Sequence, residues 1–403
     1  MNGYPTDVTI VEAFFMPALF WFPFVLSFPL ITMRVYSEEF RMGTFETLTT
    51  APVKDWQVVL SKFFGVLIFY IILWTPTLCS FAAFQYITGR VAANAAGAYW
   101  GTYLLLLLMG GFFISIGCLA SALTKDQINA ATISFTTITL LLFIGFLPDI
   151  MNITAPAIKN SFAYISAIQH MQDYSKGIID SRPVIWYGSM TIFVGYLTLQ
   201  VFQGRKWDEG NGVFAIVLVI LGIVASFASF YIMQHWTASQ KLAAPVAIAV
   251  GILFIGFGYR LFLGIKGHRL QIGLNMLLQI VIVAAIIVMV NYLSYRHFKR
   301  WDFSRNQKYA LTSQTKNLLG SLKQPVKAVV FFSSAAEIQP DVISLLREYE
   351  YASDKKFQVE IVDPYRSFTR AQELQTKYKF GANENIDTVP TSRYVFRTPF
   401  KIG

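Results

Sequence analysis

Charged residues are scarce in this sequence: they make up 14% of its 403 residues, whereas hydrophobic residues make up 55%. Soluble globular proteins carry about 25% charged residues. Such a deficit excludes an ordinary soluble protein and indicates that lipid surrounds much of the chain. The two cysteines, Cys79 and Cys118, lie inside apolar runs. We therefore expect both to pack within helices, and we expect no disulfide framework and no metal site.

A nucleotide-binding loop is also absent. The sequence contains no G-x-x-x-x-G-K-[ST] motif to cradle phosphates, so ATP would have to act through a separate subunit. The apolar runs lack the buried acidic residues and histidines of a proton relay, which argues against an ion-coupled carrier or channel. No histidine follows His297, so we expect no catalysis in the C-terminal part and interpret Asp363, after a strand, as a turn residue.

Long apolar runs are the main positive feature. Each is close to the roughly 20 residues that cross the hydrocarbon core, and tryptophans near several ends suit the headgroup level. The sequence therefore predicts a mostly α protein, a polytopic bundle of about eight membrane-spanning helices. The predicted spans are Ala13–Met33, Val58–Phe81, Tyr103–Ala122, Ala130–Leu147, Trp186–Phe202, Val213–Met233, Ala244–Leu263 and Leu270–Tyr292.

The basic residues predict the topology. The net charge of +10 does not indicate a nucleic-acid partner, because Lys and Arg beside membrane spans explain it. These residues are concentrated in alternate connections, the first of which contains Arg34, Arg41 and Lys54. The positive-inside rule then places that connection in the cytoplasm and the C-terminal segment outside. The cluster Arg296–Arg300, directly after the last span, argues against this arrangement.

The pattern changes near Lys299. Strands are predicted at Val326–Phe332 and Phe357–Val362, and helices at Pro340–Tyr351 and Ser367–Lys379. Strands that alternate with helices are typical of a parallel α/β sheet. Two strands do not complete such a sheet, so a partial domain is expected. The predicted organisation is a membrane domain with five spans over 1–207, additional spans over 208–298, and a small α/β domain over 299–403.

The connection between the first two spans carries the most information. Its charged residues stand beside the apolar Met42, Phe45 and Leu48, which together cover one side of a helix. Gly43 weakens that helix and Pro52 ends it. From the residues alone, a short interfacial helix and a solvated loop are equally good interpretations.

This connection resembles the ABC-2 family of exporter permeases. The motif is Glu38–Leu48, then Ala-Pro-Val, then Lys62 entering the next span, and Tyr174–Tyr187 is similar to the family's external segment before its last helix. The resemblance covers residues 1–207. It implies that Glu38–Leu48 is the coupling helix that contacts an ATPase, with Phe45 as the buried anchor of that contact. The residues implied in the contact are Glu38, Glu39, Arg41, Gly43, Thr44, Phe45, Glu46 and Leu48.

Within the family, the nearest likeness is to gliding-motility-type permeases. Their partner subunit has a membrane helix followed by an extracytoplasmic α/β domain, and segments around Trp301, Tyr309 and Val329 resemble its start. The resemblance implies a fusion with the N-terminal part of that accessory subunit, pairing of two permease halves, and the bacterial plasma membrane. Family permeases usually have six helices, whereas five precede Trp207, so a further span is expected upstream of Met1.

The sequence therefore predicts the permease component of an ABC-type exporter that a separate ATPase drives. No cofactor is expected, and the substrate cannot be assigned. The alternative is a non-transporting membrane scaffold whose outer domain binds a partner. Residues Ser37–Lys54 distinguish the two, because only a permease needs an ATPase contact there.

Overall fold

The structure is a computed structural model. The chain forms two compact units, residues 1–303 and 304–403, and each is considered by itself. The structure describes residues 14–15, 18–50, 52–88, 96–150, 162–207, 267–303, 311–322, 324, 326–331, 339–353, 356–362, 371–374 and 376.

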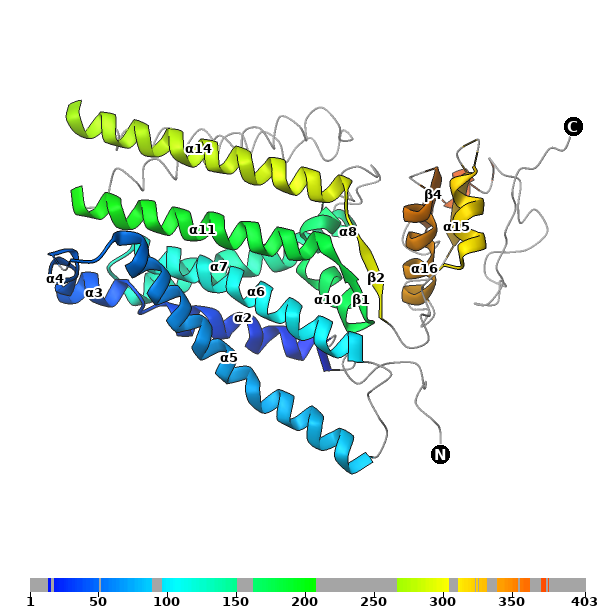
Figure 1. The fold of residues 1–403 in the computed structure, drawn as a ribbon, viewed down its shortest axis with the longest axis horizontal. Helices are drawn as coiled ribbons and strands as arrows, with labels where there is room; N and C mark the ends of the chain where they lie inside the picture. The colour runs from blue at the N-terminus through cyan, green and yellow to red at the C-terminus, as the bar shows by residue number, and fades with distance from the viewer. Residues whose placement is uncertain are drawn as a thin grey trace, which may run out of the picture. The chain divides into compact units, whose positions relative to one another are not determined.

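The first unit is a bundle of helices (Figure 1). Within the described ranges, six helical segments are long and apolar enough to cross a membrane. They confirm the first five predicted spans and the last one, whereas predicted spans Val213–Met233 and Ala244–Leu263 lie outside the described residues. The first segment, Leu19–Met42, begins in α2 (Ala18–Thr32) and ends with α3 (Ser37–Met42). The other five lie in α5 (Asp55–Thr88), α6 (Ala96–Leu123), α7 (Gln127–Phe143), α11 (Ser181–Trp207) and α14 (Gly267–Arg296).

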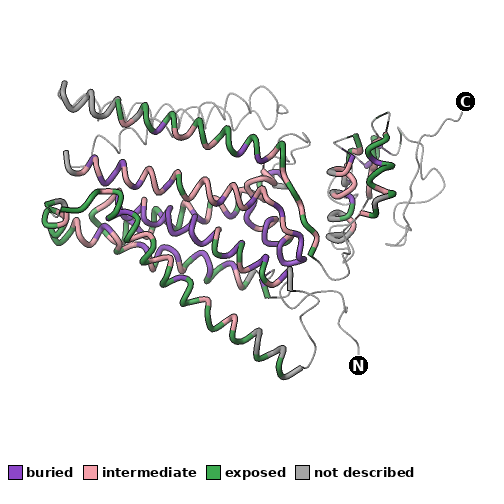
Figure 2. The backbone as a smooth tube through the Cα atoms, viewed as in Figure 1, coloured by how far each residue is buried: buried purple, intermediate pink, exposed green. Residues whose placement is uncertain are grey.

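Helix α6 forms the centre of the bundle. Its apolar window is 78% buried, against 39% or less for each of the other five (Figure 2). Glycines let neighbouring helices come close to it, as small residues do in membrane helix packing. A Cβ on Gly110 would lie 2.4 Å from the Tyr70 ring of α5, and one on Gly117 would lie 2.1 Å from Oγ1 of Thr32 on α2.

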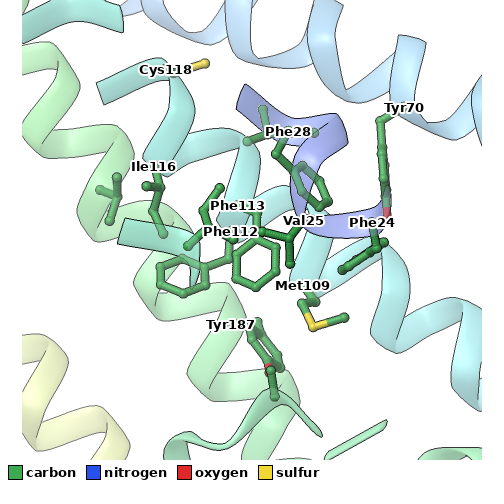
Figure 3. Close-up of a cluster of buried hydrophobic side chains, with 14 of the residues drawn as sticks. Phe24, Val25, Phe28, Tyr70, Met109, Phe112, Phe113, Ile116, Cys118 and Tyr187 are labelled. Atoms are coloured by element: carbon green, nitrogen blue, oxygen red, sulfur yellow. The ribbon is translucent and has the colours of Figure 1, made fainter. Parts of the chain in front are cut away.

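Aromatic side chains fill the space between α2 and α6 (Figure 3). The rings of Phe24 and Phe28 lie 5.0 Å apart, and Phe28 meets Phe113 of α6 at 5.2 Å, both edge to face. This geometry is favoured because a ring's positive edge meets the negative face of its neighbour. Of the two cysteines, Cys118 is buried in this core as predicted, but Cys79 is exposed.

Short polar side chains determine where several helices begin. Asp126 Oδ1 accepts a hydrogen bond from Ile128 N (3.2 Å) at the start of α7. Ser166 caps α10 (Ala167–Ser175), and Thr312 caps α15 (Ser313–Gly320) through Thr315 N (3.3 Å). Each cap satisfies a backbone N–H that the helix itself leaves without an acceptor.

Helices α11 and α14 run antiparallel, and polar side chains join them. Asn291 Nδ2 donates to Ser189 Oγ (2.8 Å), and Gln200 Nε2 donates to Gln279 Oε1 (3.1 Å). Therefore α11 ends and α14 begins at the same end of the bundle (Figure 1).

Short elements occupy the two ends of this bundle. At one end, α3 (Ser37–Met42) and α4 (Thr44–Thr50) form what we call the elbow. At the other end, α10, β1 (Ile178–Asp180) and β2 (Arg300–Asp302) form what we call the platform (Figure 1). Strands β1 and β2 pair antiparallel, with Ile178 opposite Asp302 and Asp180 opposite Arg300. The short η2 (Ile144–Phe146) and α8 (Leu147–Ile150) follow α7.

The second unit contains α15, β3 (Val326–Phe331), α16 (Gln339–Ala352) and β4 (Phe357–Val362). Strands β3 and β4 pair in parallel, with Val326 opposite Phe357, which confirms the predicted α/β pattern. Val362 packs with Ala371 and Leu374 in a small apolar cluster. The predicted turn residue Asp363 lies outside the described residues.

Candidate functional site

The elbow is helical, so the solvated-loop interpretation of this connection is wrong. It is nevertheless two short helices rather than one, because Gly43 has φ 75° and ends α3 in the left-handed conformation. Glycine adopts this conformation without the Cβ clash that other residues suffer. Glu38 and Glu39 lie in the first turn of α3 and Arg41 in its last turn, the arrangement that suits the helix dipole.

A side chain from α6 caps α3. Ser121 Oγ accepts hydrogen bonds from Tyr36 N (3.0 Å) and Ser37 N (3.1 Å), and its own hydroxyl donates to Met33 O (3.0 Å). The residue that precedes α3, Tyr36, makes no side-chain cap of its own. The start of the elbow is therefore held by a residue more than 80 positions away in the sequence.

Lys62 of α5 binds the same helix. Its Nζ lies 2.5 Å from Glu39 Oε1, donates to Val35 O at 2.6 Å, and sits 4.8 Å from the centre of the Tyr36 ring. A charge with these three partners ties α5 to the beginning of the elbow. Glu39 of the predicted contact is therefore already engaged within the chain.

An aromatic cluster joins the elbow to α11. Phe45 meets Phe40 at 4.9 Å and Phe202 at 5.2 Å. The guanidinium of Arg205 lies 4.2 Å from the Phe40 ring centre, and its Nε donates to Ala122 O at 2.8 Å. Phe45 and Leu48 are thus both partly buried against the core of the bundle.

The outward side of the elbow carries a different set of residues. Met42 is 61% exposed, although it is apolar. Arg41, Gly43, Thr44 and Glu46 are exposed as well, whereas Glu38 is half-buried. The eight predicted site residues therefore fall into two groups. Glu38, Glu39, Phe45 and Leu48 are partly buried, whereas Arg41, Gly43, Thr44 and Glu46 are exposed.

Sequence reasoning missed three residues of this site: Ser121, Phe202 and Arg205. Each lies in an apolar or basic stretch near a helix end and has no sequence motif of its own. Their role comes from the folding of α6 and α11 beside the elbow. A serine near the polar end of an apolar span is a weak signal, because such serines usually bond within their own helix.

The platform at the opposite end holds a buried polar network. His170 Nδ1 lies 3.1 Å from the Tyr187 hydroxyl, and Tyr174 OH donates to Asp180 O at 2.5 Å. Burial lowers the pKa of His170 to about 4, although nearby Asp173 and Asp180 oppose this shift. The ring is therefore neutral near pH 7.

Carboxylates of the platform lie beside two largely buried arginines, Arg182 of α11 and Arg300 of β2. Arg182 Nε donates to Asp180 Oδ2 at 2.8 Å, and Arg300 Nη2 lies 3.7 Å from Asp173 Oδ2. Within the described ranges, no cluster of three or more His, Cys, Asp or Glu side chains could hold a metal ion. The platform therefore has the character of a structural polar network.

The bundle and its elbow define a multi-pass membrane protein. Residues 3–173 match the family described as ABC-2 family transporter protein. This match supports an ABC-2-type permease, the membrane component of a transporter rather than an enzyme, and such permeases work with a partner ATPase. Residues 305–394 match a domain of unknown function (DUF7088). No curated protein and no solved structure matches the chain.

Proposed function

We propose that this chain is the membrane permease of an ATP-driven exporter, and that the elbow is the surface through which a separate ATPase drives it. The supporting observation is the attachment of the elbow to three spanning helices, through Lys62 of α5, Ser121 of α6 and Arg205 of α11. Because these contacts are short, a displacement of the elbow is transmitted to all three helices.

The proposal assigns two roles within the predicted contact. Arg41, Met42, Gly43, Thr44 and Glu46 face outward and would meet the ATPase. A large exposed apolar side chain such as Met42 gains free energy when a partner covers it.

Phe45, Leu48 and Glu39 fasten the elbow to the bundle, and half-buried Glu38 would lie at the margin of the contact. Phe45 would thus act by holding the elbow rather than by entering the ATPase. This replaces the role of buried anchor in the partner that the resemblance implied.

Truncation of Met42 tests the contact. We expect Met42→Ala to weaken ATPase binding about tenfold, because an exposed anchor loses its burial in the partner. Ile128→Ala is the matched control, since Ile128 is also apolar and exposed at the start of α7. The tagged chain would be purified from native membranes, and the bound subunit identified by its nucleotide loop and ATP hydrolysis.

Two outcomes would count against the coupling role. One is a wild-type complex with no nucleotide-hydrolysing subunit. The other is a Met42→Ala complex that binds the ATPase and exports as well as the Ile128→Ala complex does. Either result would favour a membrane scaffold.

The topology part of the proposal places the elbow in the cytoplasm and the second unit outside. The basic residues Arg41, Lys54 and Lys125 all lie in connections at the elbow end of the bundle, which supports this orientation. In a chain with Cys79 and Cys118 replaced, an impermeant thiol reagent applied to intact cells should label Gln314→Cys but not Thr44→Cys. The reverse pattern would overturn the assignment.

Finer parts of the proposal concern assembly and cell location. A fusion with an accessory subunit of the gliding-motility type is supported by α14 and by the parallel β3–β4 pair that follows it. Pairing of two permease copies is proposed from the family resemblance alone. The proposed location is the bacterial plasma membrane.

A further inference from the structure

The basic cluster after α14 contains two kinds of residue. Arg300 is buried, with 7% of its side chain exposed, and it lies 3.7 Å from Asp173. Arg296 and Lys299 are exposed, and neither has an acidic partner within the part of the chain that the structure describes. Among the described residues, one cation of the cluster therefore has an acidic partner and two have none.

Large aromatic residues are exposed beside those two cations. Trp301 is 45% exposed and Phe303 is 53% exposed. They are two residues apart in and directly after β2, so they share one face, because successive side chains of a strand point in opposite directions. Tyr292, one helical turn before Arg296, is 61% exposed.

These residues lie where a membrane span ends. The apolar window of α14 extends to Arg296, so the next residues meet the headgroup layer. The pairing of β2 with β1 holds them there, and Phe303 N donates to Gly177 O at 2.9 Å. Tryptophan and basic side chains are both favoured at this depth, since each has an apolar body and a polar end.

From this arrangement we infer that Arg296, Lys299, Trp301 and Phe303 form a binding site, the lip, for an anionic phospholipid. Arg296 and Lys299 bind the headgroup phosphate, and the two aromatic rings cover the glycerol and the upper part of the acyl chains. In this arrangement Asp173 lies beside Arg300, and the lipid compensates the other two cations. The inference rests on α14 crossing a membrane and is independent of the ATPase contact.

Lipid binding to the purified full-length chain tests this inference. Phosphatidylglycerol and phosphatidylcholine would be titrated in mixed micelles, and retained lipid counted by native mass spectrometry. The chain should prefer phosphatidylglycerol. Arg296→Gln and Lys299→Gln should each weaken its binding about fivefold, and the double variant about thirtyfold, because each basic residue contributes separately to attraction by anionic lipid.

Two further variants sharpen the test. Lys316→Gln removes an exposed charge from α15 in the second unit and should leave lipid binding unchanged. Trp301→Ala should weaken the binding of both lipids by a similar factor, because the substitution removes apolar contact rather than charge. Normal elution and thermal midpoints of the single variants would show that they are folded.

Equal binding of the two lipids, or wild-type binding by the double variant, would overturn the inference. Displacement of the lipid by inorganic phosphate, beyond the effect of chloride at equal ionic strength, would also overturn it in favour of a site for a soluble anion. The variants should keep their ATPase, so loss of the ATPase contact in Met42→Ala and loss of lipid binding here are separate results.

Discussion

The elbow and the platform are both folded against the ends of the same helices, but different chemistry holds them. The elbow is attached by side chains from separate helices: Lys62, Ser121, Phe202 and Arg205. The platform is held together by a backbone ladder between β1 and β2 and by the ion pair between Arg300 and Asp173, and Arg182 of α11 binds Asp180 of β1. A segment held by a few side chains can shift as a unit, whereas a strand ladder resists shear along its whole length.

This difference agrees with the proposed division of work. The elbow has exposed residues that a partner could cover, and it is joined to three spanning helices. The platform lies against α6, where a Cβ on Gly101 would come within 3.1 Å of Ile179. We therefore expect the elbow end to respond to ATP and the platform end to keep its structure.

The largest predicted effect is at the elbow. Ser121→Ala leaves Tyr36 N and Ser37 N without their acceptor in a buried place. We expect a loss of about 3 kcal/mol in the free energy of unfolding, because each buried donor without an acceptor costs about 1–3 kcal/mol. Thermal or detergent-induced unfolding of the purified chain would measure it.

The matched control for this variant lies on the same helix. Ser115 is also buried in α6, but its hydroxyl donates only to Phe112 O of its own helix (2.7 Å). Ser115→Ala should cost less than about 1 kcal/mol. Equal effects of the two variants would show that the capping of α3 by Ser121 does not stabilise the elbow.

A pH effect comes next and concerns the platform. The folded state keeps His170 neutral, since burial lowers its pKa to about 4. The unfolded chain takes up a proton below about pH 6.5, so stability is full above that pH and falls as the pH drops towards 4. At pH 5 the loss is about 2 kcal/mol. His170→Gln should remove this part of the pH dependence. If the free energy of unfolding of the variant falls with pH as steeply as that of the wild type, His170 is not its cause.

The smallest predicted effect is at the contact between α11 and α14. Asn291 donates to Ser189 Oγ and accepts from Tyr164 OH (3.0 Å). Asn291→Leu should cost about 1 kcal/mol, the usual size of a hydrogen bond between membrane helices. Tyr292→Leu is the control: Tyr292 is the exposed neighbour of Asn291, so its substitution should lower the free energy of unfolding by less. If both variants unfold alike, apolar packing rather than this polar contact holds α14.

Part of the candidate site could be predicted from the sequence. Gly43 and Pro52 marked the interruption and the end of a helix, and both features agree with α3 and α4. The direction in which Phe45 points could not be predicted in the same way. An apolar residue on a short amphipathic helix can face its own protein or a partner equally well, and only the tertiary structure shows that Phe45 packs against Phe202 of α11.

The sequence by itself determined the apolar spans, the weak point at Gly43 and the parallel β3–β4 pair. These features depend on the periodicity and turn chemistry of neighbouring residues. The tertiary structure alone decided that Ser121 caps α3, that β1 pairs with β2, and that Arg300 is buried beside Asp173 while Lys299 is exposed. Those contacts join residues that are far apart in the chain. The periodicity of apolar residues predicts which side of a helix is buried, but it does not identify the residue that packs against that side.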